Sequence, residues 1–170
     1  MQLENYVRDI QGFPKEGILF KDITPLLNDP EARQKCLEIL VESLKGQKID
    51  KVIGAESRGF FFGMLLADRL NAGFVPVRKP NKLPFDTISA SYDLEYGTDA
   101  LEIHVDAIKK GERVLIHDDV LATGGTAKAM ETLVKELGGE IVQFNFLMEL
   151  SFLNGREKIK DNTIFAAITY

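Results

Sequence analysis

The sequence is poor in the residues that mark disulfide-bonded and metal-binding proteins. Its 170 residues include two histidines, one cysteine and no tryptophan. The single cysteine, Cys36, excludes an internal disulfide and fits a reducing compartment, so we expect a cytoplasmic protein. Cys36 stands in an apolar stripe of helical spacing with no histidine nearby, which favours a place in the core over a nucleophilic role.

Long hydrophobic runs and an excess of positive charge are missing as well. The apolar stretch at residues 60–67 is far shorter than the about 20 residues that cross a bilayer. Residues 1–6 lack the basic start and apolar run of a secretory signal. The formal net charge is −5, so no global basic field attracts nucleic acid. We expect neither a membrane nor a nucleic-acid partner, and any phosphate site must be local.

The sequence does contain β-rich runs that alternate with helical patterns. With 45% hydrophobic residues, a chain of this length can bury one substantial core, so we expect a single domain over residues 1–170. The alternation predicts an α/β fold with a mainly parallel central sheet flanked by helices. Strands are expected at residues 52–55, 74–77, 113–117, 140–150 and 163–167, the last at an edge. Helices are expected at residues 30–44, 59–70 and 129–137.

The most informative segment is residues 114–126, where an apolar run leads into Asp118 and Asp119 and then into Thr-Gly-Gly-Thr. Gly124 and Gly125 allow the backbone to fold closely around an anion, which the N–H groups of a following helix would attract. Two acids at the carboxyl end of a strand suit ribose hydroxyls or a magnesium shell. The segment lacks the lysine of a P-loop and the three-glycine dinucleotide pattern. A plainer alternative is that Asp119 and Thr123 only cap a helix.

This combination resembles the signature of the type I phosphoribosyltransferases, which bind 5-phosphoribosyl 1-diphosphate (PRPP). The resemblance implies that Asp118 and Asp119 face the ribose and that a loop holds the 5-phosphate. That loop consists of Ala122, Thr123, Gly124, Gly125 and Thr126. It also implies Mg²⁺ as cofactor, held mainly through PRPP and water near the two acids, with no direct protein ligand. His117 marks the strand end.

Other segments are similar to the adenine branch of that family. Residues 13–27 resemble its N-terminal hood, expected at about residues 1–30, and residues 89–97 resemble its flexible flap hairpin, expected at about residues 78–103. The resemblance implies that the residues bordering adenine are Ile18, Leu19, Phe20 and Lys21. Phe20 would stack on the base while backbone groups read its edge. An ordinary core position for Phe20 is the alternative.

Residues 54–60 resemble the family's pyrophosphate loop. The residues that the resemblance places around the diphosphate are Glu56, Ser57, Arg58, Arg78, Lys79 and Lys82. It also predicts a cis peptide bond between Glu56 and Ser57. The alternatives are a surface ion pair between Glu56 and Arg58, and a basic loop that is merely solvated.

Glu95 matches the flap glutamate of the family and is the expected catalytic residue; an exposed hairpin acid is the alternative. The implied reaction converts adenine and PRPP into AMP and diphosphate in purine salvage, by a homodimer. The aromatic run at residues 60–62 could supply its interface. Two other functions stay open: transfer to xanthine or another purine, and a regulatory module that binds PRPP without catalysis. The hood sequence disfavours the first, and the lack of a DNA-binding extension disfavours the second.

Overall fold

A computed structural model describes residues 1–93 and 98–170 of the chain. They form two compact units, Met1–Ile39 and Leu40–Tyr170. Glu95 lies outside the described residues. None of the helices in the described part is long and apolar enough to cross a membrane.

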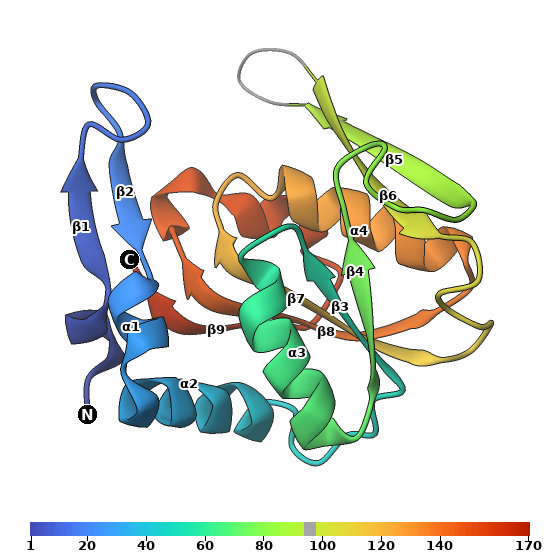
Figure 1. The fold of residues 1–170 in the computed structure, drawn as a ribbon, viewed down its shortest axis with the longest axis horizontal. Coiled ribbons are helices and arrows are strands. Elements are labelled where there is room, and N and C mark those ends of the chain that lie inside the picture. Colours follow the sequence, from blue (N-terminus) through green and yellow to red (C-terminus); the bar gives the residue numbers. More distant parts are fainter. Residues whose placement is uncertain (94–97) are drawn as a thin grey trace. The chain divides into compact units, whose positions relative to one another are not determined.

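The N-terminal unit is built around a short antiparallel hairpin (Figure 1). A 3-10 helix, η1 (Leu3–Tyr6), precedes the strands β1 (Arg8–Gln11) and β2 (Leu19–Asp22), and α1 (Thr24–Asn28) and α2 (Pro30–Glu42) follow. Helix α2 confirms the helix expected at this point, although it ends at Glu42 rather than at residue 44. The residues of β1 and β2 are exposed or half-buried. The sequence of these strands therefore lacks the alternation of apolar and polar residues that would have predicted them.

The larger unit contains a five-stranded, fully parallel sheet in the order β4-β3-β7-β8-β9. Its strands are β3 (Lys51–Ala55), β4 (Gly73–Val77), β7 (Arg113–Leu121), β8 (Glu140–Glu149) and β9 (Ile164–Thr169). The predicted parallel sheet is confirmed, with β9 at its edge. Strand β7 extends four residues beyond the predicted strand at residues 113–117. Asp118 and Asp119 therefore lie within the strand, near its carboxyl end, rather than after it.

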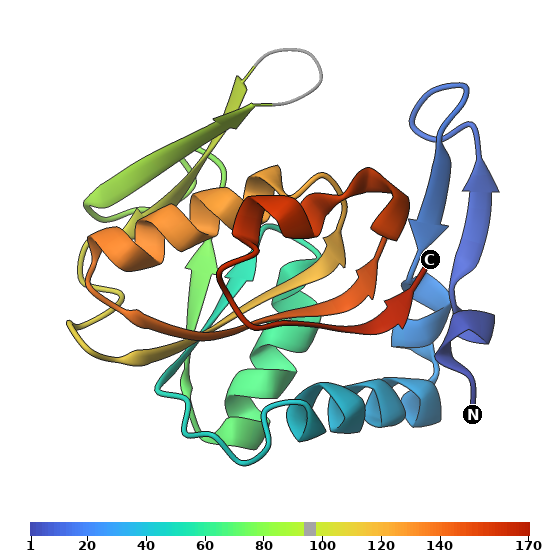
Figure 2. The same cartoon turned by 180° about the vertical axis from the view of Figure 1, so that it is seen from behind.

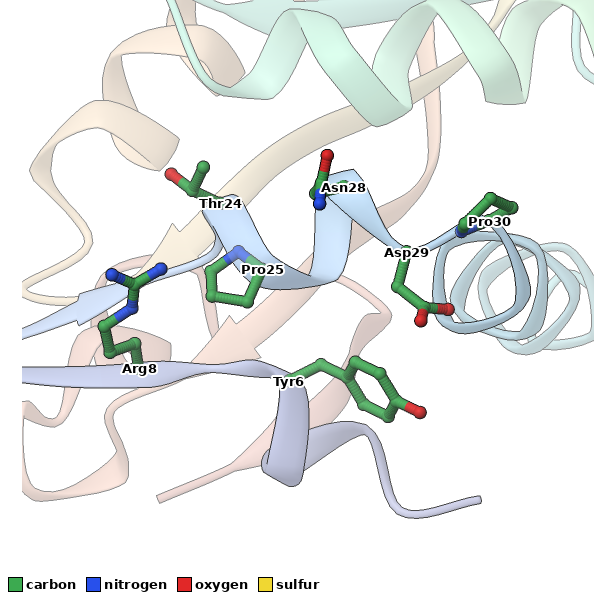
Figure 3. A pocket seen from close by; sticks show the side chains of 7 residues that line it. All are labelled: Tyr6, Arg8, Thr24, Pro25, Asn28, Asp29 and Pro30. Atoms are coloured by element: carbon green, nitrogen blue, oxygen red, sulfur yellow. The ribbon is translucent and has the colours of Figure 1, made fainter.

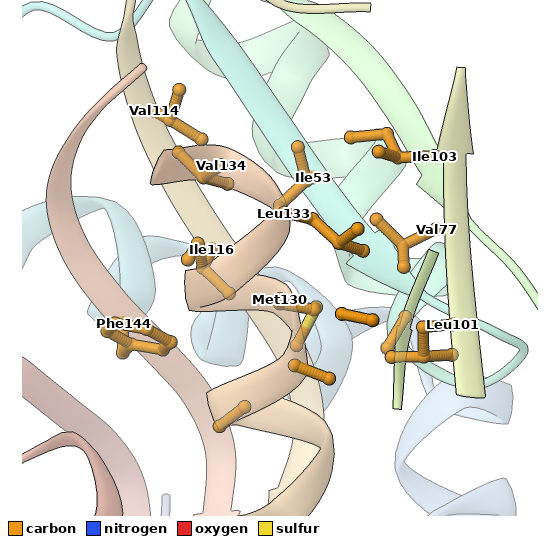
Figure 4. Close-up of a cluster of buried hydrophobic side chains, with 14 of the residues drawn as sticks. Ile53, Val77, Leu101, Ile103, Val114, Ile116, Met130, Leu133, Val134 and Phe144 are labelled. Carbon is orange, nitrogen blue, oxygen red and sulfur yellow. The ribbon is translucent and has the colours of Figure 1, made fainter. Parts of the chain in front are cut away.

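Helices α3 (Gly59–Leu70) and α4 (Gly125–Glu136) cover opposite faces of this sheet (Figures 1 and 2). Helix α4 packs its apolar stripe, which includes Met130, Leu133 and Val134, against Ile53 and Ile116 of the sheet (Figure 4). The stripe was expected from its 3.6-residue spacing. The sheet therefore has a helix on each face, with the core between α4 and the strands.

An antiparallel hairpin, β5 (Thr87–Asp93) and β6 (Thr98–His104), lies beside α4 (Figures 1 and 2). Leu101 and Ile103 bury their side chains in the same core. Backbone hydrogen bonds in both directions between Arg78 and Glu102 tie the hairpin to the end of β4. After β8, the 3-10 helices η2 (Ser151–Leu153) and η3 (Gly155–Ile159) lead to β9.

Candidate active site

Three loops that carry predicted site residues leave the same edge of the sheet. Strands β4, β3 and β7 are parallel neighbours, so their carboxyl ends meet there. Glu56 follows β3, Arg78 follows β4, and the loop of residues 122–126 follows β7. The peptide bond between Glu56 and Ser57 is cis, as the sequence predicts.

Asp118 and Asp119, which we call the acidic pair, belong to β7, and their carboxyls lie beside the start of α3. Asp119 is buried, and its Oδ2 lies 2.9 Å from Nε of Arg58, an ion pair without the alignment of a hydrogen bond. Oδ1 of Asp118 accepts the Asp119 N–H at 2.8 Å. The same oxygen lies against Gly59, where a Cβ atom would come within 2.9 Å of it. Gly59 therefore leaves the space that the Asp118 carboxyl occupies.

Burial changes the acidity of both carboxyls. It raises the pKa of Asp118, and the neighbouring charge of Asp119 raises it further. Burial also raises the pKa of Asp119, while the guanidinium of Arg58 opposes that rise. Such a pair favours any ligand that brings positive charge or hydroxyl donors.

Residues 122–126, which we call the phosphate loop, form a backbone cradle at the start of α4. Gly124 is the N-cap of α4 and has a left-handed φ of 80°, which favours glycine. The first N–H groups of a helix have no partner within it, so they can donate to an anion. The N-cap falls on Gly124 rather than on Thr123, and Asp119 pairs with Arg58. Helix capping therefore does not account for this motif.

Residues 78–82, which we call the basic loop, are held by Glu56. Its carboxylate accepts hydrogen bonds from Arg78 Nε at 3.2 Å, from the Lys79 N–H at 3.0 Å and from Lys82 Nζ at 2.5 Å. Burial alone would raise the pKa of Glu56, but these donors lower it to about 2. The alternative of a Glu56–Arg58 surface pair is wrong, since each residue pairs elsewhere.

The side chain of Lys79 points to the hairpin instead. Its Nζ contacts Oδ2 of Asp99 and lies 2.8 Å from the hydroxyl of Tyr92. The ring of Tyr92 also packs on Gly125, where a Cβ would come within 3.0 Å of Cδ2. Tyr92 thus touches both the basic loop and the phosphate loop. The sequence did not single out Asp99 or place the Tyr92 hydroxyl, because both contacts depend on the hairpin register.

The four residues expected to border adenine belong to the N-terminal unit. Leu19, Phe20 and Lys21 lie on β2, and Ile18 precedes it. Phe20 is half-buried and meets Phe13 edge-on, with ring centroids 5.0 Å apart, so it is not an ordinary core residue. Nζ of Lys21 lies 2.7 Å from Asp9.

The same unit has a pocket of about 400 Å³ that the sequence did not predict (Figure 3). Its lining residues are Tyr6, Arg8, Thr24, Pro25, Asn28, Asp29 and Pro30. They come from the end of η1, the start of β1, helix α1 and the start of α2. None of them was expected to bind adenine.

Cys36 is buried, and burial raises the pKa of its thiol to about 12. The thiol is therefore protonated at neutral pH and is no nucleophile, which agrees with the core interpretation. His117 is also buried, and burial lowers its pKa to about 4 despite the contact of its Nδ1 with Asn145 Oδ1 at 3.2 Å. The interpretation of His117 as a strand-end residue is wrong, because β7 continues to Leu121. A neutral, enclosed imidazole agrees with the absence of an acid–base role.

Comparison with known proteins identifies the family. Residues 23–165 match the phosphoribosyl transferase domain model. An adenine phosphoribosyltransferase of Flavobacterium johnsoniae is 81% identical over 170 residues and covers 100% of both chains. This chain belongs to the adenine phosphoribosyltransferase family.

Solved structures of this family have the same fold. The adenine phosphoribosyltransferase of Thermoanaerobacter pseudethanolicus superposes with a TM-score of 0.96 at 52% identity, covering 99% of this chain and 100% of that one. The enzyme of Saccharomyces cerevisiae, in complex with an imino-altritol bisphosphate and adenine, gives a TM-score of 0.91 at 44% identity, with coverages of 96% and 95%. The α/β fold with a parallel sheet and the family resemblance are both confirmed.

Proposed function

We propose that this chain carries out the reaction of its family at the sheet edge where the phosphate loop, the basic loop and the acidic pair meet. It is a pentosyltransferase of purine salvage that converts adenine and PRPP into AMP and diphosphate. The observation that carries the assignment of roles is that a backbone loop and a cationic loop lie at the same sheet edge as two acids, the buried Asp119 and the half-buried Asp118. PRPP has the same pattern, with a phosphate at one end, a diphosphate at the other and a ribose between.

The phosphate loop is assigned to the 5-phosphate. Its backbone N–H groups and the N-terminus of α4 attract a dianion, and Thr123 and Thr126 add hydroxyl donors. Ala122, Gly124 and Gly125 let the chain pass close to the ligand. Binding energy gained here would orient the reacting carbon without taking part in the chemistry.

Asp118 and Asp119 are assigned to the ribose and its surroundings. Their carboxylates would accept the ribose hydroxyls and stabilise positive charge that develops on the sugar. They also fit Mg²⁺, which prefers oxygen ligands. Within residues 1–93 and 98–170, no three His, Cys, Asp or Glu side chains gather into a metal-binding group. We therefore propose that Mg²⁺ is held mainly by PRPP and water beside these acids, where it would neutralise diphosphate charge.

The diphosphate is assigned to the basic loop and to the turn at the end of β3. Glu56, Ser57 and Arg58 form that turn, and Arg78, Lys79 and Lys82 supply cations. Glu56 and Asp99 now neutralise the three cations of the basic loop. A diphosphate carries more charge than either carboxylate, so it would draw these cations towards itself.

The adenine base is assigned to Ile18, Leu19, Phe20 and Lys21 in the predicted hood. Phe20 offers an aromatic face, and the backbone of β2 offers donors and acceptors. A backbone reading of the base edge separates adenine from guanine, because their donors and acceptors are exchanged. The yeast relative, 44% identical, was solved with adenine bound.

Glu95 is proposed as the catalytic residue of a flap at about residues 78–103. A ring nitrogen of adenine attacks the anomeric carbon, the bond to the diphosphate breaks, and the configuration inverts through an oxocarbenium-like transition state. Glu95 would accept the proton that the base loses or stabilise the cationic sugar. Flap closure would keep out water that hydrolyses the activated sugar.

A homodimer in the cytoplasm completes the proposal. Phe61 and Met64 lie one helical turn apart on α3, with 48% and 54% of their surface exposed. Side chains three residues apart share one face of a helix, so the two form an apolar patch suited to a subunit contact. The single buried thiol fits a reducing compartment.

The test is product formation from Mg²⁺, PRPP and one of four bases: adenine, hypoxanthine, guanine or xanthine. We expect AMP from adenine alone, and we expect Glu95→Ala to slow the reaction by about 10²- to 10⁴-fold without losing ribose 5-phosphate binding. Asp106→Ala, which removes an exposed acid just past the hairpin, is the matched control. Turnover of another purine only would make the chain a sister transferase. Binding of PRPP without turnover of any base would support the regulatory alternative.

A further inference from the structure

A second glycine, Gly155, lies directly behind the phosphate loop although it is about 30 residues further along the chain. It is buried at the start of η3. A Cβ atom at Gly155 would overlap with the carbonyl oxygen of Ala122 and would lie 3.1 Å from the nitrogen of Gly124. A Cβ atom at Gly124 would in turn overlap with the carbonyl oxygen of Gly155. The two backbones are therefore in contact with no room for a side chain between them.

The segment that carries Gly155 is fixed on both sides. Before it, the Leu150 N–H donates to the Leu121 carbonyl at 2.9 Å, where β7 ends. After it, Arg156 donates from Nε to both carboxylate oxygens of the buried Glu149, at 2.7 and 2.8 Å. Such a pair is held in one orientation, because a planar guanidinium matches a carboxylate.

A third contact ties the end of this segment to α4. The side-chain Nδ2 of Asn162 donates to Oε1 of Glu131 on α4 at 3.0 Å and to the backbone carbonyl of Ile159 at 3.2 Å. The loop at the start of α4 and the segment behind it are therefore docked as one piece.

We infer that Gly155 is a positioning residue for the sugar-phosphate substrate: its bare backbone supports the phosphate loop from behind and sets the loop's shape. This inference rests on the proposed role of residues 122–126 in binding the 5-phosphate. The loop has no lysine, so its affinity depends on where its N–H groups point. Moving the Ala122 peptide would misdirect these donors, whereas the hood and the basic loop would be unaffected.

The test is Gly155→Ala, with KM measured separately for PRPP and for adenine. We expect KM for PRPP to rise roughly 10- to 100-fold, because misplacements of about 1 Å have effects of this size, and KM for adenine to change little. Thermal melting with ribose 5-phosphate should show that most of the ligand-induced stabilisation is lost. A role in folding alone would lower the melting temperature and leave both the KM values and this shift intact.

Two further variants keep the test decisive. Gly73→Ala is the matched control, since its Cβ would meet only the flexible end of Lys51 at 3.1 Å. If Gly155→Ala does not fold, Arg156→Lys keeps the charge but loses the two-pronged contact with Glu149, and KM for PRPP should rise about threefold. If the wild type binds ribose 5-phosphate and the variants bind it equally well, the inference is overturned. If the wild type itself does not bind it, the proposed role of the phosphate loop fails first.

Discussion

The phosphate loop and the basic loop, to which we assign the two anionic ends of PRPP, are built on opposite principles. The phosphate loop uses backbone: a left-handed glycine, a helix N-terminus and a second glycine pressed against it from behind. The basic loop uses long side chains, and in the described structure each of its three cations is paired with a carboxylate of the same chain. The phosphate loop has its shape before a ligand binds. The cations of the basic loop must leave their carboxylate partners before they can bind a ligand.

Under the proposed function, this difference suits the two ends of PRPP. The 5-phosphate stays on the product, so a rigid cradle can hold it throughout the reaction. The diphosphate must bind and then leave with its negative charge. Ion pairs permit this, because the cations can return to their carboxylate partners when the diphosphate departs. Substitutions in the phosphate loop should therefore act through shape, and substitutions in the basic loop through charge.

Among substitutions in the two loops, the largest effect is expected from Gly124→Ala. An alanine at position 124 would have to adopt the left-handed φ of 80° that Gly124 has, and its Cβ would overlap with the Gly155 carbonyl oxygen. We expect kcat/KM for PRPP to fall about 100-fold, as for a misplacement of about 1 Å at a positioning group. Steady-state kinetics with PRPP as the varied substrate would measure this.

Gly111→Ala is the control for that variant, because Gly111 has a φ of 81° with nothing within 4 Å of its Cβ position. It should cost about 1 to 2 kcal/mol of stability and leave kcat/KM unchanged. Equal kinetic losses in the two variants would mean that backbone strain, and not the shape of the loop, explains the effect.

A smaller effect is expected from Lys82→Ala in the basic loop. Removing one charged donor to a diphosphate should raise KM for PRPP about tenfold, since hydrogen bonds to charged groups are worth about 1.5 to 3 kcal/mol. The control is Lys48→Ala, at a lysine whose side chain is 78% exposed and pairs with Asp50. A loss that is insensitive to salt concentration would argue against a charge-based contact.

Asp99→Asn should act in the opposite direction. The substitution weakens the partner that holds Lys79, so that this cation becomes more available to a diphosphate. We expect diphosphate to bind about threefold more tightly, the size of a modest surface ion pair. Asp86→Asn makes the same charge change at an exposed site and controls for it. Weaker binding in Asp99→Asn would show instead that Asp99 holds Lys79 in its binding position.

The smallest effect concerns stability against pH. The pKa of Glu56 is lowered from 4.5 to about 2, so its ion pairs stabilise the fold above pH 4.5 and lose this contribution as the pH falls towards 2. Glu56→Gln should melt at a lower temperature than the wild type at neutral pH, and the gap should close near pH 2. Glu136→Gln, at an exposed glutamate of α4, is the control. A difference in melting temperature that does not change with pH would contradict the stabilising role of the Glu56 charge.

Sequence predicted the parts of this molecule that depend on local pattern. The apolar runs of β3 and β8 and the stripe of α4 follow from periodicity, and the phosphate loop follows from its own glycines and acids. The contact of Gly155 with Ala122 and that of Lys79 with Asp99 could not be predicted in this way. Both join segments about 20 to 30 residues apart, and their positions depend on how the chain packs after it folds. The exact pairing of Arg58 with Asp119 rather than Glu56 has the same origin.

The most direct test of the account is to titrate ribose 5-phosphate and diphosphate, each with Mg²⁺, into the wild type, Gly124→Ala and Lys82→Ala by calorimetry. We predict a crossed pattern: Gly124→Ala loses ribose 5-phosphate but keeps diphosphate, and Lys82→Ala does the reverse. Equal losses of both ligands in both variants, or none in either, would contradict the assignment of the two loops to the two ends of PRPP.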